Sequence, residues 1–139
     1  MGRGLARIDL SYFLLTTIGD FSGTLKGQEA ELTGTGDGRL FGFFVLPSGA
    51  SLAQIDPTTG ATQAPVDLPG VADADSAWAF SFWGGDFWFY SADLTSSASR
   101  VTRLRTSGDG SLSVVMPDVG GFVIVGAGVS TCAPTRPPM

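Results

Sequence analysis

The sequence predicts an all-β protein built from a repeated four-stranded unit, and three observations lead to this prediction. Residues 31–56 and residues 80–105 share one plan: an apolar strand, a glycine-rich turn with an aspartate, an aromatic strand, a small polar loop and an alternating strand. Corresponding positions such as Gly36 and Gly84 lie about 48 residues apart, and a fixed period of this size is typical of repeat folds. No stretch carries a sustained helical period.

The first unit contains four predicted strands separated by turn residues. The apolar run at 40–46 indicates a strand buried on both faces. The segment DPTTG at 56–60 is a turn, because proline fixes φ and glycine accepts positive φ. Pro65 places the last strand at a sheet edge, since proline has no N–H to donate. We expect strands at 30–35, 39–46, 51–55 and 61–68.

The second unit follows the same order, and a third unit is divided between the two ends of the chain. Residues 5–9 (LARID) nearly repeat residues 52–56 (LAQID), so the N-terminus supplies a third strand at 5–10 and a fourth at 13–18. Residues 122–125 are expected to open this third unit at the other end of the chain. Within the second unit we expect strands at 78–83, 87–92, 100–104 and 111–116.

Four strands per unit at this period are typical of the blades of a β-propeller. The units resemble the blades of YVTN- and NHL-type propellers, in which an aromatic strand is followed by an I-D-P-x-T-G turn, here IDPTTG at 55–60. The ending VGAGVSTCAP resembles the C-terminus of uncharacterised extracellular bacterial propellers, which implies an extracellular parent family. The predicted partial propeller spans residues 1–134, and residues 135–139 form a disordered tail. Its blade pieces lie at about 5–20, 27–68, 75–117 and 120–134.

About three blades per chain cannot close a ring, because propellers have about four to eight. An open arc would expose two apolar blade faces to water. Two copies related by a twofold axis solve this problem, so we predict a homodimer that closes as a six-bladed ring. The alternative is that the chain is a fragment of a longer propeller.

Composition excludes several classes of function. The 139 residues carry a net charge of −5, which argues against a nucleic-acid partner. No apolar run approaches the roughly 18 residues that span a membrane, and Asp9 and Ser11 interrupt the N-terminal run that a signal peptide would need. We therefore expect a soluble protein with no signal peptide in this chain. With Cys132 as its one cysteine and no histidine, the chain has neither an intrachain disulfide nor the usual base for a nucleophile.

Two acidic residues, Glu29 and Glu31, are the candidate catalytic or metal-binding groups. They alternate on the predicted innermost strand, so both side chains are expected to face the same way. Such a pair could bind Ca²⁺ or another divalent cation, or provide a general acid and a general base. Solvated glutamates are the simpler alternative. Asp73 and Asp75 precede the corresponding strand of the next unit and would lie at the same rim.

The aromatic cluster at 80–90 is the most prominent local feature. Packing between blades is its simplest explanation, and a platform that stacks on sugars is the alternative; Trp78 and Trp83, near strand ends, are the best candidates for the latter. The candidate ligand-binding residues are Gln28, Asp73, Asp75, Trp78 and Trp83.

Other polar residues are interpreted as structural. Asp37, Asp86 and Asp109 lie beside glycines and are expected to bond their own turns, and so is Asp56. Arg100, Arg103 and Arg105 are expected to form the solvated face of an outer strand.

Two functions follow from these predictions. The first is a binding module that recognises a small molecule, a glycan or a protein at a central channel. The second is a hydrolase that acts on an ester, a phosphoester or a glycoside through acidic residues at the channel mouth. The missing histidine favours binding, and no cofactor is certain.

Overall fold

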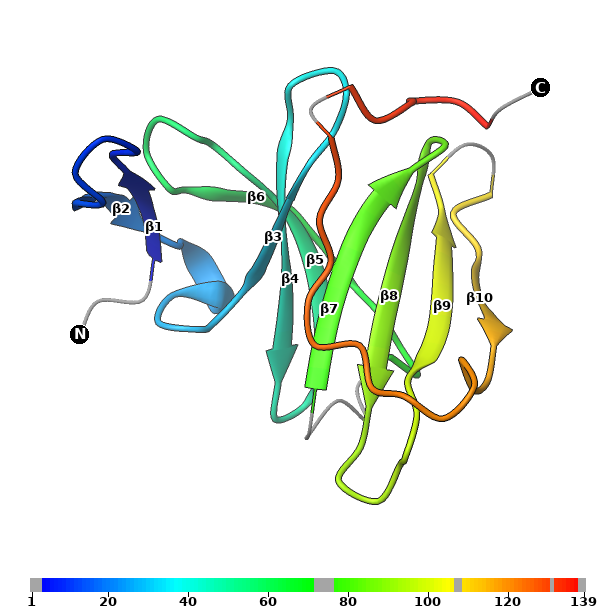
Figure 1. Cartoon of the computed structure of the whole chain (residues 1–139). Helices are drawn as coiled ribbons and strands as arrows, with labels where there is room; N and C mark the ends of the chain where they lie inside the picture. Colours follow the sequence, from blue (N-terminus) through cyan, green and yellow to red (C-terminus); the bar gives the residue numbers. More distant parts are fainter. Residues whose placement is uncertain (1–3, 72–76, 107–108, 131, 138–139) are drawn as a thin grey trace.

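The computed structural model describes residues 4–71, 77–106, 109–130 and 132–137. It is an all-β structure of three antiparallel sheets with two, four and four strands, none of them closed (Figure 1). The described residues include no α-helix, and their one 3-10 helix is Gly23–Leu25. No helix in this part of the chain is long and apolar enough to cross a membrane.

The central sheet is a simple meander of strands β3 to β6, as predicted. Pro65 lies on β6, which is the edge strand, and the register shifts between Leu52 and Gln54 of the neighbouring strand. A shift of this kind leaves a residue of the edge strand unpaired, which accommodates proline. The four strands are β3 (Glu31–Gly34), β4 (Leu40–Leu46), β5 (Gly49–Ile55) and β6 (Thr62–Asp67).

The C-terminal sheet repeats this meander with strands β7 to β10. Its turn between the first two strands is shorter, because Trp83 and Asp86 already pair across Gly84 and Gly85. Both glycines have positive φ, which this tight turn requires. The four strands are β7 (Ala77–Trp83), β8 (Asp86–Ala92), β9 (Arg100–Arg105) and β10 (Leu112–Met116).

The N-terminal residues form a two-stranded hairpin sheet of β1 (Gly4–Ile8) and β2 (Leu15–Asp20). They lie close to the strands predicted at 5–10 and 13–18. The strand expected at 122–125 is absent, and the described segment 119–130 contains no strand. The later part of this segment runs beside β7 in Figure 1. Val129, within the segment, packs on the core. A lone segment forms no ladder, because a strand is defined by its partner.

Two apolar clusters join the three sheets, and the central sheet contributes to both. Phe43 packs toward the C-terminal sheet, with its ring 4.9 Å from that of Phe89. Phe44 points the opposite way, and its ring lies 5.1 Å from that of Phe21 beside the hairpin sheet. Because successive side chains of a strand alternate, these two residues explain why β4 is buried on both faces, as predicted. The aromatic cluster at 80–90 also serves mainly in packing between sheets, since Phe80, Phe82, Phe87 and Phe89 belong to the same core.

Candidate functional site

A pocket of about 220 Å³ lies between β3 and β7, the first strands of the two four-stranded sheets. Glu31 of β3 and Trp78 of β7 line it, together with Ala77 and Val125. Glu31 pairs with Phe43, so its side chain points to the face of the central sheet that meets the C-terminal sheet. Two candidate residues from different units are therefore brought together by the packing of neighbouring sheets.

The chemistry of this pocket is that of an aromatic surface beside an acceptor. Glu31 is half-buried and presents a carboxylate, which accepts hydrogen bonds from hydroxyl or ammonium groups. Trp78 is also half-buried and packs on the core, which fixes the indole. The pocket is smaller than the roughly 300–1,000 Å³ typical of sites for drug-sized ligands. It suits a small polar ligand with one apolar face.

Glu29 and Glu31 lie in different local structure. Strand β3 begins at Glu31, so Glu29 lies just before the strand whose alternation was expected to align the two side chains. Glu29 is exposed and Gln28 is half-buried, and neither lines the pocket. Asp73 and Asp75 lie outside the described residues.

Trp83 lies far from Trp78, although both belong to β7. Trp83 follows Trp78 by five positions, which corresponds to about 17 Å along a strand. Their side chains point to opposite faces, because the separation is an odd number of residues. Trp83 is 50% exposed. The two tryptophans therefore belong to different surfaces.

The described residues do not assemble a metal site. Among them, no group of three carboxylate, histidine or cysteine side chains is placed to hold an ion. The pocket itself provides one described carboxylate, whereas Ca²⁺ takes about six to eight oxygen ligands. A cation site at Glu29 and Glu31 therefore stays a prediction.

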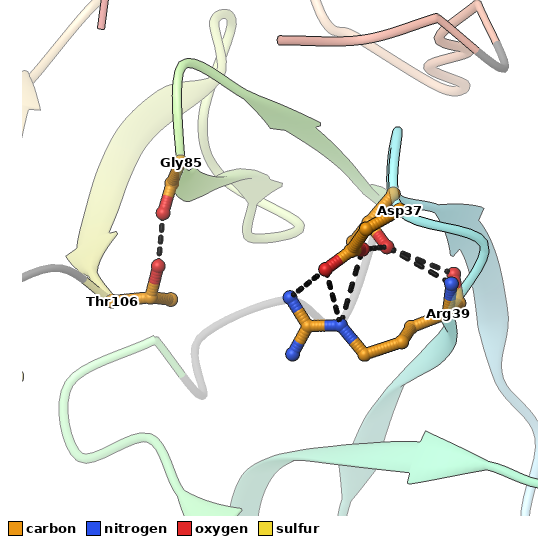
Figure 2. Close-up of polar contacts among 5 residues, drawn as sticks. Asp37, Arg39, Gly85 and Thr106 are labelled. Carbon is orange, nitrogen blue, oxygen red and sulfur yellow. Dashed lines mark hydrogen bonds and ion pairs between the residues drawn. The ribbon is translucent and has the colours of Figure 1, made fainter. Parts of the chain in front are cut away.

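The turn aspartates behave largely as expected, and Figure 2 shows one of them. Asp37 accepts hydrogen bonds from the Thr35 hydroxyl and from Arg39 Nε, the latter at 3.0 Å to Oδ2. These two side chains hold the pKa of Asp37 below its ordinary value, with Thr35 the larger cause. Asp56, Asp93 and Asp109 likewise have lowered pKa values through hydrogen bonds within their own turns.

Asp86 differs from these turn residues, and the role expected for Arg103 was wrong. Asp86 is 1% exposed and accepts hydrogen bonds from Arg103 Nε at 2.7 Å and from the backbone N–H of Thr106 at 3.1 Å. The Thr106 hydroxyl also donates to the carbonyl of Gly85 (Figure 2). Arg103 thus pairs with a buried carboxylate, while its own side chain stays 26% exposed. The sequence offers no local signal for this pairing, since the partners are distant in the chain and meet only in the sheet.

A second pocket, of about 320 Å³, was not anticipated from the sequence. Ser91, Asp93, Ser96 and Arg100 line it on the C-terminal sheet. Ser91 is 2% exposed, and its hydroxyl has no hydrogen-bond partner among the described residues. A weak signal was present: the aromatic strand of the first unit has Phe44 in the corresponding place, so a serine there interrupts the apolar pattern.

Comparison with models of known protein families found no match, and comparison with curated protein sequences found none that is significantly similar. The site must therefore be interpreted from its own geometry.

Proposed function

We propose that the chain is a section of a β-propeller that binds a carbohydrate, either a small sugar or the terminal residue of a glycan, between β3 and β7. The observation that carries the proposal is that Glu31 and Trp78 line one pocket at the junction of two sheets. The propeller arrangement is supported by two consecutive four-stranded meanders that pack face to face. Their first strands, β3 and β7, are neighbours. In a propeller these are the strands nearest the axis.

A carbohydrate fits the chemistry of the two residues better than a fully apolar ligand. One face of a sugar ring carries C–H groups that stack on an indole such as that of Trp78. Its hydroxyl groups donate hydrogen bonds to a carboxylate, and Glu31 provides one. Neither contact requires a metal ion.

Hydrolysis would require more than this pocket presents. Glycoside hydrolysis uses two carboxylates on either side of the scissile bond. Glu31 provides the one carboxylate in the described lining, and Glu29 does not line the pocket. Binding is therefore the function that the geometry supports.

A glycan array followed by calorimetric titration with the best sugar tests the proposal. Glu31→Gln and Trp78→Phe should each weaken binding roughly fivefold, because each weakens a contact by about 1 kcal/mol. The matched controls are Glu29→Gln and Trp83→Phe, which change the same residue types outside the pocket and should stay within about twofold. Thermal unfolding of each variant establishes that the fold is retained.

Two results would overturn the proposal. One is the failure of every glycan on the array to bind. The other is turnover of a chromogenic ester, phosphoester or glycoside that disappears in Glu31→Gln, which would assign the pocket to a hydrolase instead.

A further inference from the structure

The two four-stranded sheets can be compared residue by residue through their strand registers. Gly34 pairs with Leu40 at the end of β3, and Phe82 pairs with Phe87 at the corresponding place in β7 and β8. Leu40 packs toward the hairpin sheet, and Phe82 and Phe87 pack toward the central sheet. In both sheets this pair therefore faces the sheet that comes before it in the sequence. Trp88 and Tyr90 therefore occupy the positions that Phe41 and Phe43 occupy in the central sheet.

Phe41 and Phe43 are core residues, because the C-terminal sheet covers them. Their counterparts lie on the opposite surface of the C-terminal sheet, which we call the terminal face. Cross-strand contacts there confirm that its side chains share one surface: the Arg103 guanidinium lies 5.2 Å from the Trp88 ring, and the Tyr90 hydroxyl bonds Ser81. Trp88 and Tyr90 are half-buried, and Trp83 is 50% exposed. The terminal face consists of Trp83, Trp88, Tyr90, Val101 and Arg103.

The hairpin sheet presents the complementary surface at the other end of the chain. LARI at 5–8 repeats LAQI at 52–55, so Ile8 corresponds to Ile55. Ile55 is fully buried, because it faces the hairpin sheet, whereas Ile8 is 47% exposed. Its cross-strand partner Leu15 is 74% exposed. We call this surface the hairpin face, and its residues are Ala6, Ile8, Leu15 and Thr17.

We propose that a second copy of this chain packs its hairpin face against the terminal face. Within one chain, each sheet already covers its neighbour through these two kinds of surface, once between the hairpin and central sheets and once between the central and C-terminal sheets. The two surfaces that remain uncovered are the terminal face and the hairpin face, which are one of each kind. A second copy is therefore the occupant whose surface chemistry matches both.

A twofold axis closes this arrangement. The terminal face of each copy meets the hairpin face of the other, so the same interface forms twice and no apolar face is left over. Six sheets then form one ring. The inference rests on the repetition of the sheets and does not depend on a sugar ligand.

Sedimentation equilibrium and light scattering test the proposal on the full chain. The wild type should have twice the mass of the 14.4 kDa chain. Trp83→Glu and Leu15→Lys should each raise the dimer dissociation constant by roughly thirtyfold or more, because each places a charge in an apolar interface. Leu94→Glu is the control, since Leu94 is 77% exposed in a loop outside both faces and should leave the mass unchanged.

Mixing the two variants gives the sharpest test. In a mixed dimer, one interface carries the glutamate opposite the lysine, and the other interface carries neither substitution. The mixture should therefore dimerise more tightly than either variant does alone. Circular dichroism establishes that each variant is folded, and Val101→Glu replaces Trp83→Glu if the latter does not fold.

Three results would overturn the proposal. The first is a wild type that stays at 14.4 kDa at every concentration. The second is a dimer that persists in the folded variants of both faces. The third is a mixture that remains monomeric, which would show that the two faces do not meet.

Discussion

Arg103 of β9 donates a hydrogen bond of 2.7 Å to the buried carboxylate of Asp86, at the start of β8. The pair fixes the β7–β8 turn to the neighbouring strand, because the backbone N–H of Thr106 bonds the same carboxylate. In contrast, the ion pair between Asp37 and Arg39 in the corresponding turn of the central sheet is nearly half exposed. The corresponding turns are therefore stabilised by an ion pair with a buried carboxylate in one sheet and by a solvated ion pair in the other.

Asp86→Ala should lower the free energy of unfolding by about 3 kcal/mol, because it leaves the partly buried guanidinium of Arg103 without its partner. Urea denaturation followed by circular dichroism measures the change. Asp37→Ala is the control, and its effect should be much smaller, since solvent screens the exposed pair. Equal effects of the two substitutions would contradict the distinction between the pairs.

Thr58→Val should raise the pKa of Asp56 toward its ordinary value of 3.8. The Thr58 hydroxyl donates a 2.6 Å hydrogen bond to Asp56 Oδ1, and this bond is the largest cause of the lowered pKa. Titration of the carboxyl carbon by NMR measures the shift. Thr95→Val is the control, because it removes the corresponding bond to Asp93 and should move only the pKa of Asp93.

The sign of the pH dependence follows from these lowered values. A carboxyl whose pKa is lower in the folded state than in the unfolded state stabilises the fold above the unfolded value of 3.8. That contribution is lost as the pH falls through the folded pKa. The stability of Thr58→Val should consequently depend less on pH in this acidic range, and an unchanged slope would contradict the role of Thr58.

Gly36→Ala should displace the C-terminal segment from the β3–β4 turn. A Cβ atom at Gly36 would meet the backbone carbonyl of Ala133, which is 2% exposed and belongs to the core. Amide hydrogen exchange should therefore quicken in the C-terminal segment. Gly34→Ala is the matched control, since its nearest new neighbour is 3.9 Å away, and it should leave exchange there unchanged.

Ser91→Ala should raise the free energy of unfolding by about 1 kcal/mol, because it removes a buried hydroxyl that has no partner among the described residues. Ser99→Ala provides the opposite case. Ser99 is also buried, but its hydroxyl accepts a 2.8 Å hydrogen bond from Ile124 N–H, so its loss should destabilise by about 1 kcal/mol. A loss of stability in Ser91→Ala would contradict this prediction, because it would mean that the hydroxyl is satisfied in the folded protein.

The strands were largely predictable from the sequence, because strand formation depends on local patterns. The apolar run of β4 predicted burial on both faces. Phe43 and Phe44 confirm this prediction, because their side chains pack on opposite faces of the central sheet. Pro65 predicted an edge strand, because a residue without an N–H cannot pair on both sides. The prediction of a strand at 122–125 was wrong, because an apolar run forms a strand only where a partner strand lies beside it.

The candidate site was only partly predictable. Glu31 and Trp78 were both chosen from the sequence, but their meeting in one pocket depends on how two sheets pack. Trp83 was predicted for the same reason as Trp78, its place near a strand end. Its side chain points to the opposite face of β7, because an odd number of positions separates the two tryptophans.

By itself, the sequence determined the all-β class, the repeat of about 48 residues and the alternation that divides each strand between two faces. These are properties of neighbouring residues along the chain. The tertiary structure decided which faces meet, which aspartate is buried against an arginine, and which surfaces at the two ends lack the cover that their counterparts have. Those relationships join residues that are distant in sequence, so they arise only when the sheets pack together.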